Sequence, residues 1–321
     1  MATTLIGLRQ RSRRALARYL PPGAKRLIRR VMAYRPSRSS APATRRFDLR
    51  VPLPPIARKF PVPARIRIEA PAGLFVPRVL EANGFAGYEP DAAACFLAAI
   101  DEVDAKAAFD VGASVGVFAV LAAAVTSAEV TGFEPTPDIA AAFESIVRTN
   151  ELRCRVEAIA LGASNGTATL HLSSSTDSSN SLRAGFREAT GTVDVPLERL
   201  DDYCARRGIQ PAVLKVDTET TEPDVFRGAA ELLATARPWI VCEVLAGRTE
   251  KDLMEILRPF GYHWFHITDV MPFAPSDVIA GDPTYRHLDW LFAPVLPSER
   301  YWARAAAWRE SLAACTPIAR E

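Results

Sequence analysis

Residues 106–125 read KAAFDVGASVGVFAVLAAAV and carry the clearest structural signal in the chain. The apolar run that ends at Val111 predicts a buried strand, and the run that begins at Val117 predicts an apolar helix. The turn between them contains Gly112 and Gly116. A strand that enters a helix through a glycine turn is typical of open α/β sheets, in which ligands bind beyond the carboxyl ends of the strands.

Strands and helices alternate on both sides of this stretch. This spacing predicts a mostly parallel sheet with helices on both faces. Two late apolar segments, YHWFHI (262–267) and HLDWLFAP (287–294), have no clear helix between them, so we expect an antiparallel hairpin at the sheet edge. The predicted fold class is α/β, with a doubly wound, mostly parallel, seven-stranded sheet. The other predicted helices are 92–103, 139–150, 224–233 and 251–260, and the other predicted strands are 129–135, 155–161, 167–173, 213–217 and 239–245.

Four segments are expected along the 321-residue chain. Residues 1–47 form a basic extension that is flexible or a peripheral helix. Residues 48–87 are punctuated by proline, which predicts an extended lead-in with short pieces or edge strands. The α/β domain occupies 88–296, and a C-terminal helix is expected in 297–321.

The net charge of +2 conceals an uneven distribution. No acidic residue precedes Asp48, where arginine is frequent, whereas the chain from residue 85 onward is acidic. A basic head of this kind indicates an anionic surface as partner, either a membrane or a nucleic acid. A weak stripe of leucines in 1–47 would suit an interfacial helix, and a solvated tail is the alternative.

The cysteines and the apolar runs indicate the compartment. Five cysteines lie far apart without a CxxC pair, which predicts neither a zinc site nor a disulfide framework and favours a reducing compartment. The longest apolar run, 117–125, is far shorter than the roughly 20 residues of a membrane-spanning helix. We expect a cytoplasmic protein that touches anionic membrane, if at all, peripherally through 1–47.

The glycine turn and the end of the next strand together predict a pocket for an adenosine-containing ligand. Gly112 would let a ligand approach the backbone, and Gly116 would let the helix pack close to the strand. The GxxxG spacing is not the GxGxxG that seats a pyrophosphate. Asp110 would repel phosphate and suits the positive charges of S-adenosylmethionine, while Glu134 is placed to accept ribose hydroxyls. A purely structural turn and a solvated carboxylate are the alternatives.

A second stretch, LKVDTETTE at 214–222, carries a lysine and three acids at the end of a buried strand. Like charges this close are costly unless they bind a cation or a hydroxyl-rich substrate, or share a proton. Asp217 is the first candidate for a base that takes the proton of an acceptor hydroxyl, and Glu222 is the second. Neutralisation of these acids by Lys215 is the structural alternative.

The acids Asp217, Glu219, Glu222 and Glu243 could also hold a hard cation such as magnesium through oxygen ligands. An acidic cluster at strand ends does not by itself establish a metal, and we assign no metal site here.

One long segment supports a more specific interpretation. Between about residues 88 and 268 the chain contains, in order, DVGASVGVFA, GFEPTPDIAAAFESIVRTN, AIALGASNGTATLHL, NSL, VPLERLDDYC, LKVDTETTEPDVFRGAAELL and PWIVCEV. In order and spacing these stretches resemble the FkbM family of S-adenosylmethionine-dependent methyltransferases, and HLDWLFAP resembles the family's final strand.

The resemblance implies a class I, Rossmann-like methyltransferase that methylates a hydroxyl of a sugar, a glycolipid or a polyketide-like small molecule. No nucleic-acid partner is expected. Asn180 and Ser181 match the family's NSL loop, a candidate lid over the substrate. The residues assigned to S-adenosylmethionine are Asp110, Gly112, Ser114, Gly116 and Glu134; those assigned to the substrate are Asn180, Ser181, Lys215 and Glu219; and those assigned to catalysis are Asp217 and Glu222.

Two positions depart from the family pattern. The family usually has Asn where this chain has Ser114, and Gly where it has Thr220. Glycine would permit a backbone conformation that a β-branched residue resists, so the acceptor side could be altered or inactive. The alternatives to an enzyme of this kind are a non-catalytic cofactor-binding scaffold and, with less support, a nucleic-acid methyltransferase; a dehydrogenase lacks the required glycine spacing.

Overall fold

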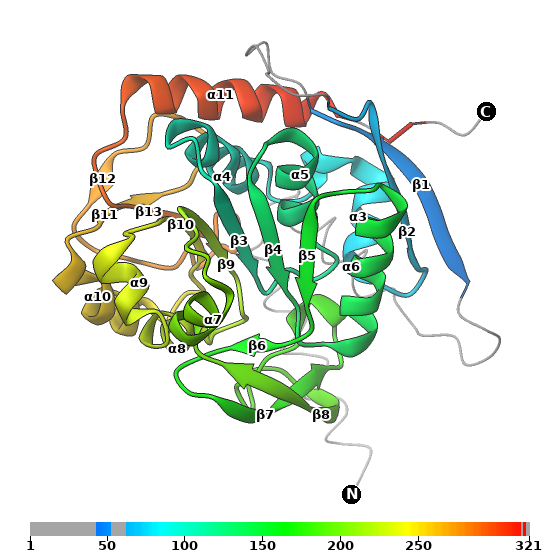
Figure 1. Cartoon of the computed structure of the whole chain (residues 1–321), viewed down its shortest axis with the longest axis horizontal. Helices are drawn as coiled ribbons and strands as arrows, with labels where there is room; N and C mark the ends of the chain where they lie inside the picture. Colours follow the sequence, from blue (N-terminus) through cyan, green and yellow to red (C-terminus); the bar gives the residue numbers. More distant parts are fainter. Residues whose placement is uncertain (1–42, 53–61, 316, 319–321) are drawn as a thin grey trace, which may run out of the picture.

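The computed structural model describes residues 43–52, 62–315 and 317–318. Its centre is an eight-stranded sheet in the order β12-β11-β13-β10-β9-β3-β4-β5 (Figure 1). The five strands from β10 to β5 in this order are parallel, and β11, β12 and β13 pair antiparallel. The strands are β3 (Ala107–Val111), β4 (Glu129–Phe133), β5 (Cys154–Glu157), β9 (Val213–Val216), β10 (Trp239–Glu243), β11 (His263–His266), β12 (Pro275–Ser276) and β13 (Asp289–Ala293).

The predicted doubly wound sheet with an antiparallel edge is confirmed. The additional strand is the two-residue β12, which lies in the loop 272–285 and pairs with β11. A strand this short leaves no alternation in the sequence by which to recognise it.

Helices cover both faces of the sheet, and alternate strand residues face the two layers. Ala108 belongs to one hydrophobic cluster and Phe109 to the other. On the first face lie α4 (Pro90–Glu102), α5 (Val117–Val125) and α6 (Pro137–Thr149). On the second lie α7 (Leu200–Arg207), α8 (Glu222–Arg227), α9 (Ala230–Thr235) and α10 (Glu250–Leu257), which is followed by η3 (Arg258–Phe260).

The last helix, α11 (Glu299–Ala313), lies across α4 (Figure 1). Ser298 caps it by accepting a hydrogen bond from the Tyr301 backbone N–H. The Tyr301 hydroxyl donates to the Cys95 carbonyl at 3.2 Å. The last helix of the chain thus packs over α4, although the two helices are far apart in the sequence.

The segment before α4 is more structured than predicted. β1 (Thr44–Arg50) and β2 (Arg65–Pro71) pair as a separate antiparallel ribbon, followed by α3 (Phe75–Asn83) and η1 (Phe85–Gly87). Residues 44–47, placed in the basic extension by the sequence, therefore begin a strand, and the extended lead-in contains a helix. The rest of the expected extension, 1–42, lies outside the described residues. No helix of the described residues is long and apolar enough to cross a bilayer.

A small second sheet lies beyond the carboxyl ends of the main strands (Figure 1). It consists of β6 (Ala160–Leu161), β7 (Gly166–Ser173) and β8 (Ala189–Glu198), with η2 (Asp177–Ser179) in the connection. The single strand predicted at 155–161 divides into β5 and β6, and β8 was not predicted.

The single helix predicted over 224–233 is also divided. α8 and α9 meet at Gly228, where a Cβ atom would collide with the carbonyl oxygen of Gly162. Glycine at this corner lets the helical segment bend against the loop after β6.

Candidate active site

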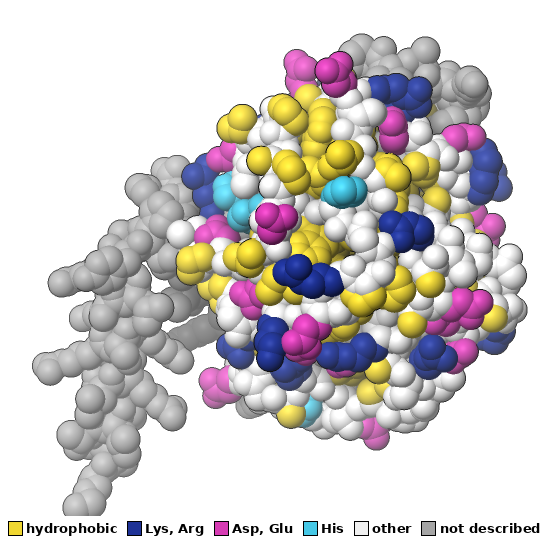
Figure 2. Space-filling view, turned by 90° about the vertical axis from the view of Figure 1, so that its left-hand side faces the viewer, with side chains coloured by type: hydrophobic (Ala, Val, Ile, Leu, Met, Phe, Trp, Pro, Cys, Tyr) yellow, Lys and Arg dark blue, Asp and Glu magenta, His cyan; other side chains and the backbone are white. Residues whose placement is uncertain are grey.

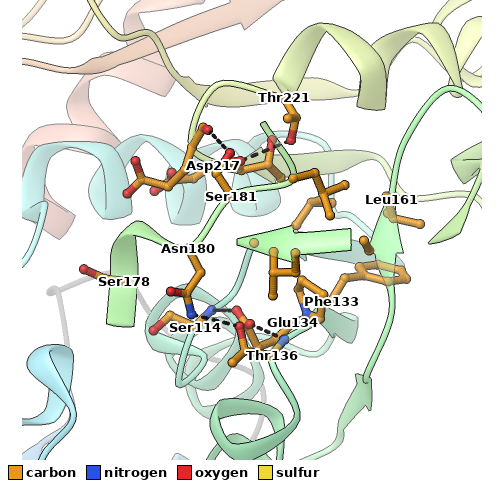
Figure 3. Close-up of a pocket in the computed structure, with 18 of the residues that line it drawn as sticks. Ser114, Phe133, Glu134, Thr136, Leu161, Ser178, Asn180, Ser181, Asp217 and Thr221 are labelled. Atoms are coloured by element: carbon orange, nitrogen blue, oxygen red, sulfur yellow. Dashed lines mark hydrogen bonds between the residues drawn. The ribbon is translucent and has the colours of Figure 1, made fainter. Parts of the chain in front are cut away.

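A pocket opens at the carboxyl ends of β3, β4 and β9, under the β7–β8 connection (Figure 3). It encloses about 570 Å³ of empty space, part of it open to solvent. Of the predicted site residues, seven line it: Gly112, Ser114, Glu134, Asn180, Ser181, Asp217 and Glu219.

Four predicted site residues do not line this pocket: Asp110, Gly116, Lys215 and Glu222. Each lies close behind its wall. Gly116 has φ 80° and faces the ring of Phe143, with which a Cβ atom would collide. Its contact in the structure is therefore with α6, whereas the sequence predicted that it lets the following helix pack close to the strand.

Gly112 brings the first turn against the strand that carries the expected base. Its φ is 80°, and a Cβ atom would overlap the carbonyl oxygen of Asp217. Only glycine combines this left-handed conformation with so close a backbone approach. The glycine turn and the end of β9 consequently form one wall of the pocket.

Asp110 is buried at the end of β3, with 2% of its surface exposed. Its Oδ2 accepts a hydrogen bond from the backbone N–H of Ala119 in α5 at 3.0 Å. Burial raises the pKa of Asp110 to about 7, although Lys215 and the Ala119 N–H act in the opposite direction. This carboxyl can therefore change its charge near neutral pH.

Glu134 projects from the end of β4 toward the pocket (Figure 3). Its Oε2 accepts from the Ser114 backbone N–H at 2.9 Å, and its Oε1 accepts from the Thr136 backbone N–H at 2.7 Å. Burial raises the pKa of Glu134, while these hydrogen bonds favour its charged form. Two fixed donors therefore orient the carboxylate at the pocket wall.

The connection between β7 and β8 crosses the pocket and is fastened on two sides. Asn180 donates from Nδ2 to the Thr136 hydroxyl at 3.3 Å, and Ser181 donates from its hydroxyl to the Glu219 carbonyl at 2.7 Å. The predicted NSL loop thus spans the space between β4 and β9 (Figure 3).

The apolar half of this pocket was not predicted from the sequence. It is lined by Ile159 just before β6, Leu161 in β6 and Leu170 in β7. Asp177 of η2 also lines it, and its Oδ1 accepts from the Phe75 backbone N–H at 2.8 Å. The alternating pattern of 167–173 indicated a half-buried strand, but it did not indicate which cavity the buried side chains would face.

Lys215 lies at the centre of a buried ionic cluster, with 1% of its surface exposed. Its Nζ is 3.1 Å from Asp289 Oδ1, 3.4 Å from Asp217 Oδ2 and 3.8 Å from Glu89 Oε2. Burial would lower the pKa of Lys215, but the surrounding carboxylates outweigh burial and raise the pKa well above its usual value. The lysine is therefore charged and holds Asp217 in place.

Glu89 and Asp289 were also missed. Asp289 could have been recognised, because it is an acid inside the apolar strand HLDWLFAP and a buried charge needs a partner. Both residues line a second hollow, between the start of α4 and the 285–289 segment, with about 1210 Å³ of empty space including open solvent. The Lys215 cluster thus lies between the two hollows.

Glu222 begins α8 and is almost completely buried, with 1% exposed. Its Oε1 accepts from the Thr218 and Thr220 backbone N–H groups at 2.9 and 3.0 Å, which closes the turn after β9. In that turn Glu219 has φ 54° and Thr220 has φ 84°. The position at which the family pattern has glycine therefore does adopt a left-handed conformation in this chain.

Burial raises the pKa of Glu222 to about 7 and that of Glu219 to about 8. Together with Asp217 they crowd the carboxyl end of β9 with acids. The glycine turn after β3, Glu134 at the end of β4 and the acids after β9 therefore lie together at one edge of the sheet, where open α/β sheets bind their ligands.

This sheet order, with β13 inserted antiparallel between β10 and β11, is the fold of a class I methyltransferase, and the site lies where that fold binds its ligand. The comparison with protein families agrees. Residues 110–264, a little under half of the chain, match the methyltransferase FkbM domain, so this part of the chain is similar to that methyltransferase family. No curated protein matches the chain.

Several solved structures are similar at a distance. The methyltransferase FkbM from Methylobacillus flagellatus KT is 16% identical over 59% of this chain and 44% of its own, with a TM-score of 0.39. The magnesium protoporphyrin IX methyltransferase from Synechocystis PCC 6803, solved with bound S-adenosylmethionine, is 11% identical over 68% and 84%, with a TM-score of 0.38.

An O-methyltransferase from Bacillus cereus, in complex with SAH, is 12% identical over 67% of this chain and 87% of its own, with a TM-score of 0.37. The part aligned with the first of these structures spans less than half of that protein.

Proposed function

We propose that the chain transfers the methyl group of S-adenosylmethionine to a hydroxyl of a sugar, a glycolipid or a polyketide-like small molecule. The position of Asp217 is the observation that carries this proposal. Asp217 lines the pocket that contains Glu134 and the glycine turn, and Lys215 links it to Glu89 and Asp289 in the second hollow. A base between two hollows suits a reaction that joins a cofactor to an acceptor.

The first pocket offers groups that fit each part of the cofactor. Glu134 presents carboxylate oxygens for two ribose hydroxyls, and Ile159, Leu161 and Leu170 offer an apolar surface for adenine. Gly112 brings the turn against the end of β9 at the pocket wall, and Asp110 behind the turn supplies negative charge for the methionyl part. Bound S-adenosylmethionine would supply an electrophilic methyl group on a positively charged sulfur.

Asp217 would accept the proton of the acceptor hydroxyl, and bound S-adenosylmethionine would supply the methyl group that the hydroxyl oxygen receives. Lys215 orients this carboxylate through the 3.4 Å contact. Glu222, the second candidate base, is buried and accepts hydrogen bonds from two backbone groups, so we assign it to holding the turn. Asn180 and Ser181 fasten the loop that would exclude water from the pocket.

A non-catalytic scaffold is the second candidate, because Thr220 keeps a strained left-handed conformation in the turn beside Asp217. Nucleic-acid methylation has less support. Among the described residues on the face in Figure 2, Lys and Arg side chains alternate with Asp and Glu and do not form a continuous basic surface. The proposed membrane contact of residues 1–47 depends mainly on residues outside the described part of the chain.

Calorimetric titration of the full chain with S-adenosylmethionine tests the proposal. We expect saturable binding that Asp110→Ala and Glu134→Ala weaken, with Glu255→Ala, an exposed residue of α10, as the matched control. Transfer of labelled methyl to a panel of glycans and glycolipids separates an enzyme from a scaffold. Binding without transfer to any hydroxyl acceptor would favour the scaffold, and no binding by the folded protein would exclude both.

A further inference from the structure

Three carboxyl groups converge behind the Asp217 wall of the pocket. Asp217 follows β9, Glu222 begins α8, and Glu243 ends β10. Each offers one oxygen, and these three oxygens lie within 4.8 Å of one another. Asp217 and Glu243 are 26 positions apart in the chain. They come together because neighbouring parallel strands end at the same edge of a sheet.

Glu243 is the member of this cluster that has no other task. Its exposed fraction is 8%, and its Oε2 is buried without a hydrogen-bond partner among the described residues. An ionised carboxylate in that position is costly unless a cation or a proton compensates it. Glu243 therefore has a buried, unpaired oxygen and belongs to the same cluster as the other two acids.

The available side chains do not supply the missing positive charge. Lys215 contacts Asp217, but its two other ion pairs are with Asp289 and Glu89, on the side of the second hollow. Among the described residues, neither Glu222 nor Glu243 forms an ion pair within 4.0 Å of a basic group. Burial raises the pKa of Glu243 well above its usual value, as expected for a carboxyl that lacks a partner.

The dimensions of the cluster match a cation with oxygen ligands. Calcium–oxygen distances of about 2.3–2.6 Å place opposite ligands roughly 4.8 Å apart, whereas magnesium at about 2.1 Å places them roughly 4.2 Å apart. The three oxygens all lie within 4.8 Å of one another, which is close enough for one such ion to contact all three. Carboxylate oxygens are the ligands that both ions prefer.

We propose that Asp217, Glu222 and Glu243 bind one hard divalent cation through their carboxylate oxygens. Water fills the remaining positions of its shell. This binding is independent of methyl transfer; only one consequence rests on the proposed function, namely that a cation beside Asp217 lowers the pKa of an acceptor hydroxyl bound to it.

The test is titration of the chelator-treated full chain with MnCl₂, CaCl₂ and MgCl₂, by calorimetry and, for manganese, by electron paramagnetic resonance. We expect one saturable site and a release of protons, visible as a heat that changes with the buffer's ionisation enthalpy. Glu243→Gln keeps the shape of the side chain and removes its charge, and it should weaken binding at least about tenfold.

Glu255→Gln, on the exposed side of α10, is the control and should bind like the unchanged protein. Thermal unfolding of each variant shows that it is folded before it is titrated. No saturable binding by the folded chain at millimolar cation, or equal binding by Glu243→Gln, would overturn the proposal. S-adenosylmethionine is titrated separately into the same samples, so that failure of the cation site and failure of the cofactor pocket are read independently.

Discussion

The carboxylate of Glu134 accepts a hydrogen bond from the backbone N–H of Ser114 at 2.9 Å. This contact joins the end of β4 to the turn after β3, so that the acid and the glycine turn form one unit. The other oxygen is held by the Thr136 N–H at 2.7 Å. The acid is therefore oriented before a ligand arrives, which reduces the entropy lost on binding.

Glu134→Gln is expected to weaken S-adenosylmethionine binding by roughly tenfold to a hundredfold. An amide cannot offer two acceptor oxygens, and its NH₂ group would face one of the two backbone N–H donors. Calorimetry gives the change in Kd. Glu129→Gln, at the exposed start of the same strand, is the control; an equal loss there would contradict a specific role for Glu134.

Gly112→Ala is expected to destabilise the protein considerably more than Gly208→Ala. Both glycines have positive φ, 80° and 64°, so both substitutions carry a conformational cost of roughly 1–2 kcal/mol. At Gly112 the new Cβ would also collide with the Asp217 carbonyl, whereas Gly208 has no atom within 4 Å of that position. Urea unfolding measures both free energies, and equal values would show that the close approach does not matter.

Thr220→Gly is expected to stabilise the protein by about 1 kcal/mol. Glycine relieves the φ of 84° and removes a buried hydroxyl that has no hydrogen-bond partner among the described residues. Thr221→Gly should have the opposite sign, because Thr221 has φ −111° and its hydroxyl donates to the Thr218 carbonyl at 3.1 Å. Thermal unfolding of the two variants decides. A gain in methyl transfer by Thr220→Gly would also show that this turn limits activity.

S-adenosylmethionine binding is expected to weaken as the pH falls below about 7. Burial raises the pKa of Asp110 to about 7, with Lys215 and the Ala119 N–H opposing this rise and Asp217 and Glu134 adding to it. The raised pKa means that the folded protein binds this proton more tightly than the unfolded chain does. Protonated Asp110 therefore contributes folding stability at low pH, and this contribution is lost as the pH rises through about 7.

A positively charged ligand favours the ionised acid, so its affinity should fall by up to about tenfold for each pH unit below that value. Titrations between about pH 5.5 and about pH 7.5 measure the slope. Asp110→Asn should remove the dependence, and an unchanged slope in this variant would assign it to another group.

The main sheet and much of the first pocket could be predicted from the sequence. The run 106–125 predicts a strand, a turn and a helix. Because the carboxyl ends of parallel strands share one edge of a sheet, Gly112, Glu134 and Asp217 were expected to lie near one another. β8 could not be predicted, because Gly191 and Pro196 interrupt its alternation. The pairing of Lys215 with Asp289 depends on the insertion of β13 beside β10. This insertion is a feature of the tertiary structure and cannot be predicted from a local sequence pattern.

The two departures from the family pattern are explained by the backbone. Ser114 has φ 51° and Thr220 has φ 84°. Asn and Gly, the usual family residues, are those that adopt such values most readily. The fold therefore imposes these conformations even where the residue does not favour them.

The packing of α11 across α4 has a consequence for synthesis of the chain. Most of α4 is buried, and part of its surface is covered only by a helix that begins about 200 residues later. While the ribosome is still adding the strands of the sheet, that apolar surface stays open to water and to other nascent chains. Cotranslational assembly of this protein therefore remains incomplete until residues 299–313 leave the exit tunnel, and the interval before then is when it most needs a chaperone.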